Sequence, residues 1–411
     1  MESEEYLKIC RQLSTNYRPV EGSIPVLIEM GFIIQDDENE TEDFLRELSD
    51  NWENAKDFKV VLSGTTACNF RCAYCFENGI GRNTHLKESV IESLASFVDA
   101  TLTLHPSINR FVLSLFGGEP TLNWTPLMSA CEQLSEICDK HSVAFETRIT
   151  TNGFLLDAEK LMNLKQYNCT NIEVTLDGPE RIHDQRRMLN NGTGTFSEII
   201  KNIEYALQLQ CVSSVNVRIN IDKSNIDYVE ELLIFLSKRF QKGQINISLG
   251  TVDPIPSQPN CEDYEKNLFL SMDEYSDFVI RILPIMERYG FEVPDVYTFA
   301  GNCIAKSKHS FVLNADGNVY SCMSLIGREM HSLGCIDSFS DTASFKRTFD
   351  IDSYKRCIEK HCEFLPYCHT GCIFSGLVEN GSTLDHACNY DAYRKINAFL
   401  LKWEFERGLA K

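Results

Sequence analysis

Residues 58–75 have the sequence FKVVLSGTTACNFRCAYC, in which an apolar run is followed at once by three cysteines. The run at 58–64 is rich in β-branched and aromatic residues, so it predicts a buried strand. Cys68, Cys72 and Cys75 then lie in the loop after this strand. In parallel barrels that loop opens onto the carboxyl-terminal mouth, where functional groups are placed. The stretch therefore predicts a thiol-lined site at one end of an α/β sheet.

Further strands and helices alternate as far as residue 250. A helical pattern at 196–207, for example, places Phe196, Ile199 and Ile203 on one face. Such a repeat predicts a parallel sheet, either closed into a full or partial barrel or laid out as a doubly wound sheet. The later β-rich runs lie at 110–116, 143–150, 171–176, 214–221 and 245–250.

The alternation of strand and helix patterns ends at VDPIPSQPN (252–260), whose prolines and polar residues predict a loop or linker. We expect an appended segment at 1–56, the sheet domain at 57–255, a linker with a bridging helix at 256–299, and a cysteine-rich domain at 300–411. The appended segment, which includes the acidic run QDDENETEDF, is either a cap on the barrel or a module that recognises a leader peptide by adding a strand to a sheet edge.

Composition limits the class of protein. The 411 residues carry a formal net charge of −20, and nucleic-acid binding requires a basic surface. The MESEE start has no signal-peptide pattern, and no apolar stretch approaches the ~18 residues that span a bilayer. We therefore expect a cytoplasmic protein with neither a membrane nor a nucleic acid as partner. In a reducing cytoplasm, its seventeen cysteines indicate metal ligands or redox groups.

The spacing of Cys68, Cys72 and Cys75 suits an iron-sulfur cluster. A [4Fe-4S] cube has four irons, so three thiolates leave one iron free to bind a group other than protein. The alternatives are a zinc site with a distant fourth ligand and a chance grouping, although zinc motifs usually comprise two CxxC pairs.

CNFRCAYCFE resembles the CxxxCxxC motif of the radical S-adenosylmethionine (SAM) superfamily. The resemblance implies a partial (β/α)6 barrel and a free iron that chelates the amino and carboxylate groups of SAM. One-electron reduction would then release a 5'-deoxyadenosyl radical.

Other motifs follow later strands in the order that a radical SAM barrel implies. By this resemblance, Glu119 in GGEP bears the SAM amino group, and Arg187 in LDGPERIHDQRR clamps a carboxylate. We expect His183 and Asp184 to orient that loop. The full set of implied SAM contacts is Phe76, Gly117, Gly118, Glu119, Pro120, Thr151, Asn152, Thr175, Asp177 and Arg187.

The C-terminal cysteines resemble a SPASM domain, which implies two auxiliary [4Fe-4S] clusters, three clusters in all. Four residues separate Cys357 from Cys362, where the family has a CxxC. A zinc ribbon fits less well, since paired CxxC motifs are absent from the sequence. The implied distal ligands are Cys357, Cys362, Cys368 and Cys388, and the implied proximal ligands are Cys303, Cys322 and Cys372.

Tyr297 stands where fully ligated relatives have the fourth proximal cysteine. The proximal cluster therefore either recruits Cys261 or Cys335, or keeps an open iron that binds a substrate thiolate.

The resemblance implies a maturase that acts on a ribosomally made precursor peptide, with a flavodoxin or ferredoxin as electron donor. In the formylglycine-forming branch an aspartate follows the cysteine that corresponds to Cys322, and here that residue is Met323. We therefore expect a cross-linking enzyme, with a thioether favoured over a carbon-carbon or ether bond.

Three alternatives remain from the sequence. Two are enzymes, an anaerobic sulfatase-maturating enzyme and a peptide epimerase. The third is a multi-cluster electron-transfer protein, which would not need the GGEP motif (117–120) or the TNG motif (151–153).

Overall fold

The computed structural model describes residues 40–77, 83–252, 266–294, 297, 303–345 and 350–409. The chain divides into two compact units, Met1–Asp50 and Asn51–Lys411. Helix α3 (Glu40–Glu53) begins in the first unit, and all later elements lie in the second. The four segments expected from the sequence stay a prediction.

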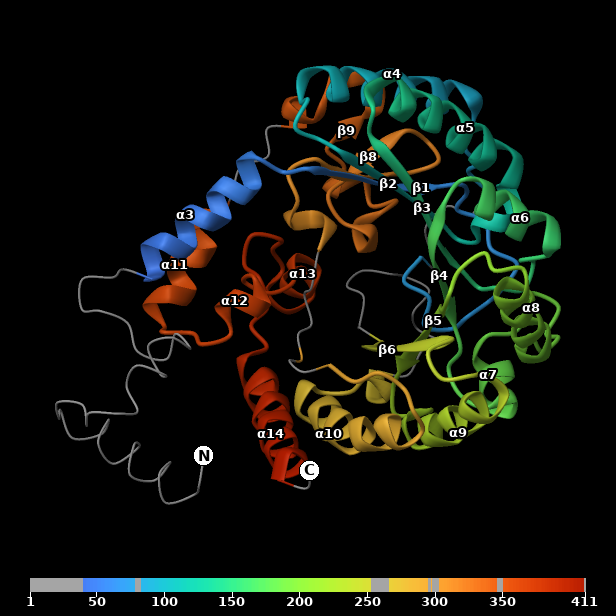
Figure 1. Ribbon diagram of the computed structural model, residues 1–411, viewed down its shortest axis with the longest axis vertical. Helices are drawn as coiled ribbons and strands as arrows, with labels where there is room; N and C mark the ends of the chain where they lie inside the picture. The colour runs from blue at the N-terminus through green and yellow to red at the C-terminus, as the bar shows by residue number, and fades with distance from the viewer. Residues whose placement is uncertain are drawn as a thin grey trace. The chain divides into compact units, whose positions relative to one another are not determined.

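A nine-stranded sheet, in the order β6-β5-β4-β3-β2-β1-β7-β8-β9, organises the second unit (Figure 1). The strands from β1 to β6 pair in parallel with their neighbours in chain order, and β7 pairs in parallel with β1. This arrangement confirms the α/β class and the partial (β/α)6 barrel. The parallel strands are β1 (Asp57–Ser63), β2 (Arg110–Phe116), β3 (Ala144–Thr151), β4 (Cys169–Thr175), β5 (Val215–Ile221), β6 (Ile245–Thr251) and β7 (Ser310–Leu313).

Helices between the strands cover the outer face of this sheet (Figure 1). Helix α8 buries Phe196, Ile199 and Ile203, which confirms the face expected from its periodicity. Beyond the barrel, α10 (Met272–Arg288) packs against α14 (Tyr390–Leu409). The barrel helices are α4 (Glu88–Leu104), α5 (Trp124–His141), α6 (Ala158–Gln166), α7 (Glu180–Arg186), α8 (Phe196–Gln208) and α9 (Val229–Arg239).

The inner face of the barrel is polar. Along β5 the apolar residues Val215, Val217, Ile219 and Ile221 are buried, whereas the polar residues between them are partly exposed. Strands covered by helices on both faces are usually apolar throughout. The alternation therefore marks a lumen that is open to water and to ligands.

The C-terminal region continues the same sheet. Strand β7 pairs antiparallel with β8 (Asn318–Tyr320), which pairs antiparallel with β9 (Gly334–Cys335). A small core, which includes Val61, Val312 and Phe374, joins β1 to this region. Three short helices follow: α11 (Ile351–Glu359), which contains Cys357, α12 (Leu365–Cys368), which ends at Cys368, and α13 (Ile373–Asn380), whose N-cap is Cys372. Of the helices that the structure describes, none has the length and apolar character to cross a bilayer.

His309, just before β7, makes stability dependent on pH. Its ring is buried and bonds Thr342 Oγ1 through Nδ1 at 2.7 Å, and its centroid lies 4.6 Å from that of the tilted His105 ring. Burial, with a smaller effect of His105, lowers the pKa of His309 to about 4. The unfolded chain takes up this proton near pH 6.5, so stability is lost as the pH falls from 6.5 towards 4. We expect the melting temperature to fall over that range, and to fall less in His309→Gln. An equal fall in both proteins would contradict this assignment.

Candidate functional site

A cavity of about 380 Å³ lies at the carboxyl ends of the parallel strands. All three cysteines of the loop after β1 line it, as do seven of the ten predicted SAM contacts. Glu119, Pro120 and Asp177 are the three that do not line it. The predicted lining residues are Cys68, Cys72, Cys75, Phe76, Gly117, Gly118, Thr151, Asn152, Thr175 and Arg187.

The three thiols are close enough to influence one another and are largely shielded from water. Burial raises the pKa of Cys68 to about 12, with Glu119 and Cys72 adding to the shift. It also raises the pKa of Cys75 to about 12, with Glu77 and Cys72 contributing. A buried thiol ionises readily only beside a compensating positive charge, such as a bound metal. The site therefore favours a cationic group over free thiolates.

The two glycines of GGEP pack directly on the backbone that leads into Cys68. Gly118 N donates to Thr65 O at 2.9 Å, and Glu119 N donates to Ala67 O at 2.8 Å. A Cβ at Gly117 would lie 2.3 Å from Thr65 O, and one at Gly118 would lie 2.5 Å from Ala67 O. Glycine is thus the only residue that leaves these two segments in contact.

Replacing Gly118 by Ala displaces the cysteine loop. We expect a loss of about 1–3 kcal/mol in the free energy of unfolding, as for other overpacked sites, together with a lower iron content after reconstitution. Thermal denaturation and iron analysis measure the two effects. Gly243→Ala is the control, because its Cβ meets nothing within 4 Å and only its positive φ is strained. A Gly118→Ala protein with full iron content and full stability would contradict the packing argument.

Glu119 connects two motifs beneath the cavity rather than facing it. Its fully buried carboxylate accepts from Thr121 N (3.0 Å), Thr121 Oγ1 (2.6 Å), Thr151 Oγ1 (2.7 Å) and Asn152 N (2.7 Å). A carboxylate has about four acceptor positions. Three of these donors bond Oε1 and only Asn152 N bonds Oε2, so the contact between the Glu119 side chain and the SAM amino group stays a prediction. The carboxylate also holds GGEP against the TNG segment (151–153).

Asp177 is likewise fully buried, in a network that includes Tyr74 of the cysteine loop. It accepts from the Tyr74 hydroxyl, from Asn220 N at 3.1 Å and from Arg186 Nε at 3.4 Å. Arg186 also pairs with Asp222 at 2.7 Å. Asp177 thus stabilises the base of the site, and the structure does not place it among the cavity-lining residues.

Arg187 is the buried cation that faces the cavity. Its Nη1 donates to the Tyr74 hydroxyl at 2.6 Å, while the buried Nε lacks a partner. Burial opposes its charge, but Cys72, Tyr74 and Asp177 keep its pKa well above the usual value. In the described part of the chain it forms no ion pair, unlike Arg186. Its free donors suit an anionic ligand.

Contacts of the neighbouring loop confirm the orienting role expected for His183 and Asp184. His183 accepts from Asp177 N at 3.3 Å through Nδ1, and its Nε2 lies 3.1 Å from Thr195 Oγ1. Asp184 accepts from the backbone amides of Thr195 and Phe196 at 2.7 and 2.9 Å.

Several lining residues were not predicted from the sequence, and Arg218 is the most prominent. Its Nε donates to Asn220 Oδ1 at 3.1 Å, and its Nη1 lies 3.4 Å from Ser248 Oγ. A Cβ at Gly250 would lie 1.7 Å from its Nη2, so glycine makes room for the guanidinium. The signal was the alternation of polar residues in VNVRINI (215–221). Other unpredicted lining residues are Phe70, Tyr74, Glu77, Phe116, Thr150, Glu173, Asn220, Thr251, Val252, Ser324 and Phe374.

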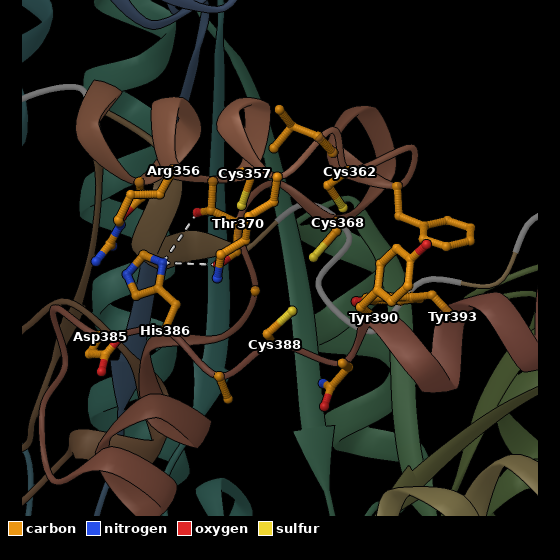
Figure 2. A pocket seen from close by; sticks show the side chains of 17 residues that line it. Arg356, Cys357, Cys362, Cys368, Thr370, Asp385, His386, Cys388, Tyr390 and Tyr393 are labelled. Atoms are coloured by element: carbon orange, nitrogen blue, oxygen red, sulfur yellow. Dashed lines mark hydrogen bonds between the residues drawn. The ribbon is translucent and has the colours of Figure 1, made fainter.

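A second cavity, of about 370 Å³, lies in the C-terminal region. It is lined by the four cysteines predicted as distal ligands, Cys357, Cys362, Cys368 and Cys388. Figure 2 shows their sulfurs pointing into one space. Burial raises the pKa of Cys357, and the other three cysteines add to the shift. The structure thus brings this predicted set together.

The three predicted proximal ligands form a separate group next to the first cavity. Burial raises the pKa of Cys322 to about 12, with Cys303 and Cys372 among the contributors. The next residue, Met323, lines the first cavity.

The three residues considered for the fourth proximal position have other surroundings or lie outside the described chain. The hydroxyl of Tyr297 lies 2.8 Å from that of Tyr275. Cys335 pairs in register with Asn318, and its Sγ lies 3.9 Å from Asp337 Oδ2. Cys261 lies outside the described residues.

The spacing of these thiols bears on the zinc alternative. A tetrahedral zinc site with Zn–S bonds near 2.3 Å places its sulfurs roughly 3.8 Å apart. Among the described residues, no three His, Cys, Asp or Glu side chains gather closely enough to hold a single metal ion. The iron-sulfur clusters at the cysteine groups stay a prediction.

Comparisons with known proteins agree with this geometry. A cysteine-type anaerobic sulfatase-maturating enzyme from Clostridium perfringens is 24% identical over 76% of this chain and 88% of its own length. The structure of native anSMEcpe with bound AdoMet and Cp18Cys peptide aligns with a TM-score of 0.65 at 18% identity, covering 86% of this chain and 99% of that one. Streptococcus suis SuiB bound to its precursor peptide SuiA aligns with a TM-score of 0.57 at 14% identity, covering 94% and 87%. Residues 62–236 match the model of the radical SAM superfamily. Residues 62–236 therefore form a radical SAM domain, and enzymes with this domain use SAM and a [4Fe-4S] cluster.

Proposed function

We propose that this protein cleaves SAM reductively in the first cavity and installs a cross-link, with a thioether favoured, in a ribosomally made precursor peptide. The observation that carries the proposal is that three cysteines and the partly unpaired Arg187 line one cavity, together with Met323, the residue that follows Cys322 of the proximal group. A radical generator and a second thiol-bound group then face the same substrate.

In this proposal Cys68, Cys72 and Cys75 hold the SAM-binding [4Fe-4S] cluster. When bound, the cluster and SAM supply a 5'-deoxyadenosyl radical that abstracts hydrogen from substrate. Arg187 binds the SAM carboxylate, because its guanidinium faces the cavity with Nε unsatisfied. The backbone of Gly117 and Gly118 lies beside the SAM amino group, since neither residue has a side chain to block the approach.

The remaining predicted contacts orient SAM or hold its pocket. Asn152 Nδ2 donates to Asn69 Oδ1 at 2.7 Å and so connects β3 to the cysteine loop. Phe76 and Thr175 line the cavity, where they confine the nucleoside. Glu119 and Asp177 act beneath it as positioning residues.

We further propose that the C-terminal cysteines hold two auxiliary [4Fe-4S] clusters. Cys357, Cys362, Cys368 and Cys388 complete the distal one, as their shared cavity supports. Cys303, Cys322 and Cys372 hold the proximal one. Tyr297 bonds Tyr275, Cys335 lies beside Asp337, and Cys261 lies outside the described residues. We propose that the fourth proximal position binds a substrate thiolate. That arrangement favours a bond from cysteine sulfur to carbon.

Formation of formylglycine is the second candidate, and similarity to the sulfatase-maturating enzyme favours it. The residue after Cys322 argues against it. Met323 lines the cavity but carries no group that accepts a proton. A peptide substrate fits both candidates, since the solved structures of anSMEcpe and SuiB contain bound peptides.

Mass spectrometry distinguishes the candidates. The reconstituted full chain is incubated anaerobically with SAM, a flavodoxin or ferredoxin reducing system, and any short peptide encoded beside the gene. We expect loss of two hydrogens and no fragmentation within the bridged segment. Conversion of a cysteine to an aldehyde would indicate formylglycine instead, and unchanged mass with deuterium uptake would indicate epimerisation. Either result would overturn the cross-linking proposal.

A further inference from the structure

Lys306 lies between the two C-terminal cysteine groups. It ends the short helix η5 (Ile304–Lys306), three residues after Cys303. Its Nζ donates to the backbone carbonyls of His369 and Gly371, and it lies 3.4 Å from Thr370 Oγ1. All three acceptors belong to the turn at 369–371, which connects Cys368 of the distal group to Cys372 of the proximal group. The Lys306 ammonium thus bonds every residue of the turn that separates the two cysteine groups.

This turn has an unusual backbone. His369, Thr370 and Gly371 have φ values of 50°, 72° and 86°, so three successive residues are left-handed. Each residue with a side chain costs roughly 1–2 kcal/mol in this conformation. The turn is also held from its other side, where His386 Nδ1 lies 3.1 Å from Thr370 O and 3.2 Å from Thr370 Oγ1 (Figure 2). The strained conformation therefore persists because side chains from two other segments hold it.

Among the described residues no carboxylate lies within ion-pair distance of the Lys306 ammonium, and the electrostatic effect of Asp350 on it is smaller than that of the nearby thiols. The thiols that interact with it electrostatically are Cys303, Cys368 and Cys372, which come from both groups. A largely desolvated cation is costly unless a negative charge compensates it. A cluster bound by thiolates is negative overall, and it becomes more negative by one unit on reduction.

We propose that Lys306 is a positioning residue shared by both auxiliary clusters, which clamps the 369–371 turn and electrostatically favours the reduced form of each cluster. This inference rests on the proposed function, since that proposal supplies the clusters. Reduction adds one electron from an external donor to a cluster, with no proton transfer. A nearby positive charge raises the midpoint potential of such a couple. Both auxiliary clusters therefore become easier to reduce, as electron exchange with the cavity requires.

The test uses the full chain with Cys68, Cys72 and Cys75 replaced by Ala, so that only auxiliary clusters contribute to the spectra. Redox titration with dithionite, followed by electron paramagnetic resonance, gives the midpoint potentials. We expect Lys306→Met to shift both potentials to more negative values, and Lys306→Arg, which keeps the charge, to stay close to the parent. Unchanged potentials in a fully loaded Lys306→Met protein would overturn the inference.

A second variant separates the clamp from the charge. If Lys306→Met loses iron, adding His369→Gly and Thr370→Gly is expected to restore it, because glycine adopts positive φ without strain. The potentials of this rescued protein are still expected to be more negative than those of the parent. Parent-like potentials after rescue, or failure of the glycines to restore iron, would contradict the inference. A parent protein that binds no iron would instead overturn the proposed auxiliary clusters.

Discussion

Replacing Cys68, Cys72 and Cys75 together by Ala removes about four irons from each reconstituted chain and reduces SAM cleavage to background. The three thiols come from one short loop and line the same cavity. Serine or a buried backbone group cannot replace three soft thiolate ligands at once. The measurements are iron and sulfide content, and the yield of 5'-deoxyadenosine with dithionite as reductant.

The matched control is Cys131→Ala. Cys131 is a fully buried cysteine of α5 that lines neither cavity, and we expect its removal to leave iron content and SAM cleavage intact. Retention of cleavage by the triple variant would place the SAM-binding cluster elsewhere in the chain.

Replacing Arg187 by Met is expected to weaken SAM binding about 10- to 100-fold, the size of a lost charge-assisted hydrogen bond to a carboxylate, roughly 1.5–3 kcal/mol. The guanidinium is buried at the cavity and has an unsatisfied Nε. The measurement is the SAM dissociation constant of the cluster-loaded protein. We also expect the ratio of affinities for SAM and its decarboxylated analogue to shrink in the variant.

Tyr74→Phe provides the control for Arg187→Met. It removes the hydrogen bond between Arg187 Nη1 and Tyr74 but leaves the guanidinium in place. We expect its SAM affinity to stay within a few-fold of the parent. Equal losses in the two variants would show that Arg187 acts only by supporting the cysteine loop.

The barrel could be predicted because each of its strands and helices is indicated by the residue pattern of its own segment. Each strand from β1 to β6 carries its own apolar pattern. The division of the C-terminal cysteines into two groups came instead from the resemblance to a SPASM domain. The pattern at 196–207 also identified the buried face of α8. Such features need no knowledge of contacts between distant segments.

The features that the sequence did not predict are contacts between distant segments. The acceptor positions of Glu119 are filled in part by Thr151 and Asn152, more than thirty positions away. The position of the Arg218 guanidinium depends on Gly250 of the next strand, because any side chain at residue 250 would occupy its space. Lys306 contacts a turn in which His369 and Thr370 have positive φ, and neither histidine nor threonine is a residue type that predicts this conformation. Hydrogen-bond saturation and close packing of this kind appear only once the chain is folded.

The central claim is that the chain generates a radical from SAM at Cys68, Cys72 and Cys75. Its most direct test is the amount of 5'-deoxyadenosine formed when the anaerobically reconstituted full chain is mixed with SAM and dithionite. Formation that requires both the protein and the reductant is the expected result. A chain with fully loaded clusters, as measured by iron content and electron paramagnetic resonance, that releases no 5'-deoxyadenosine in the presence or absence of peptide would contradict the claim.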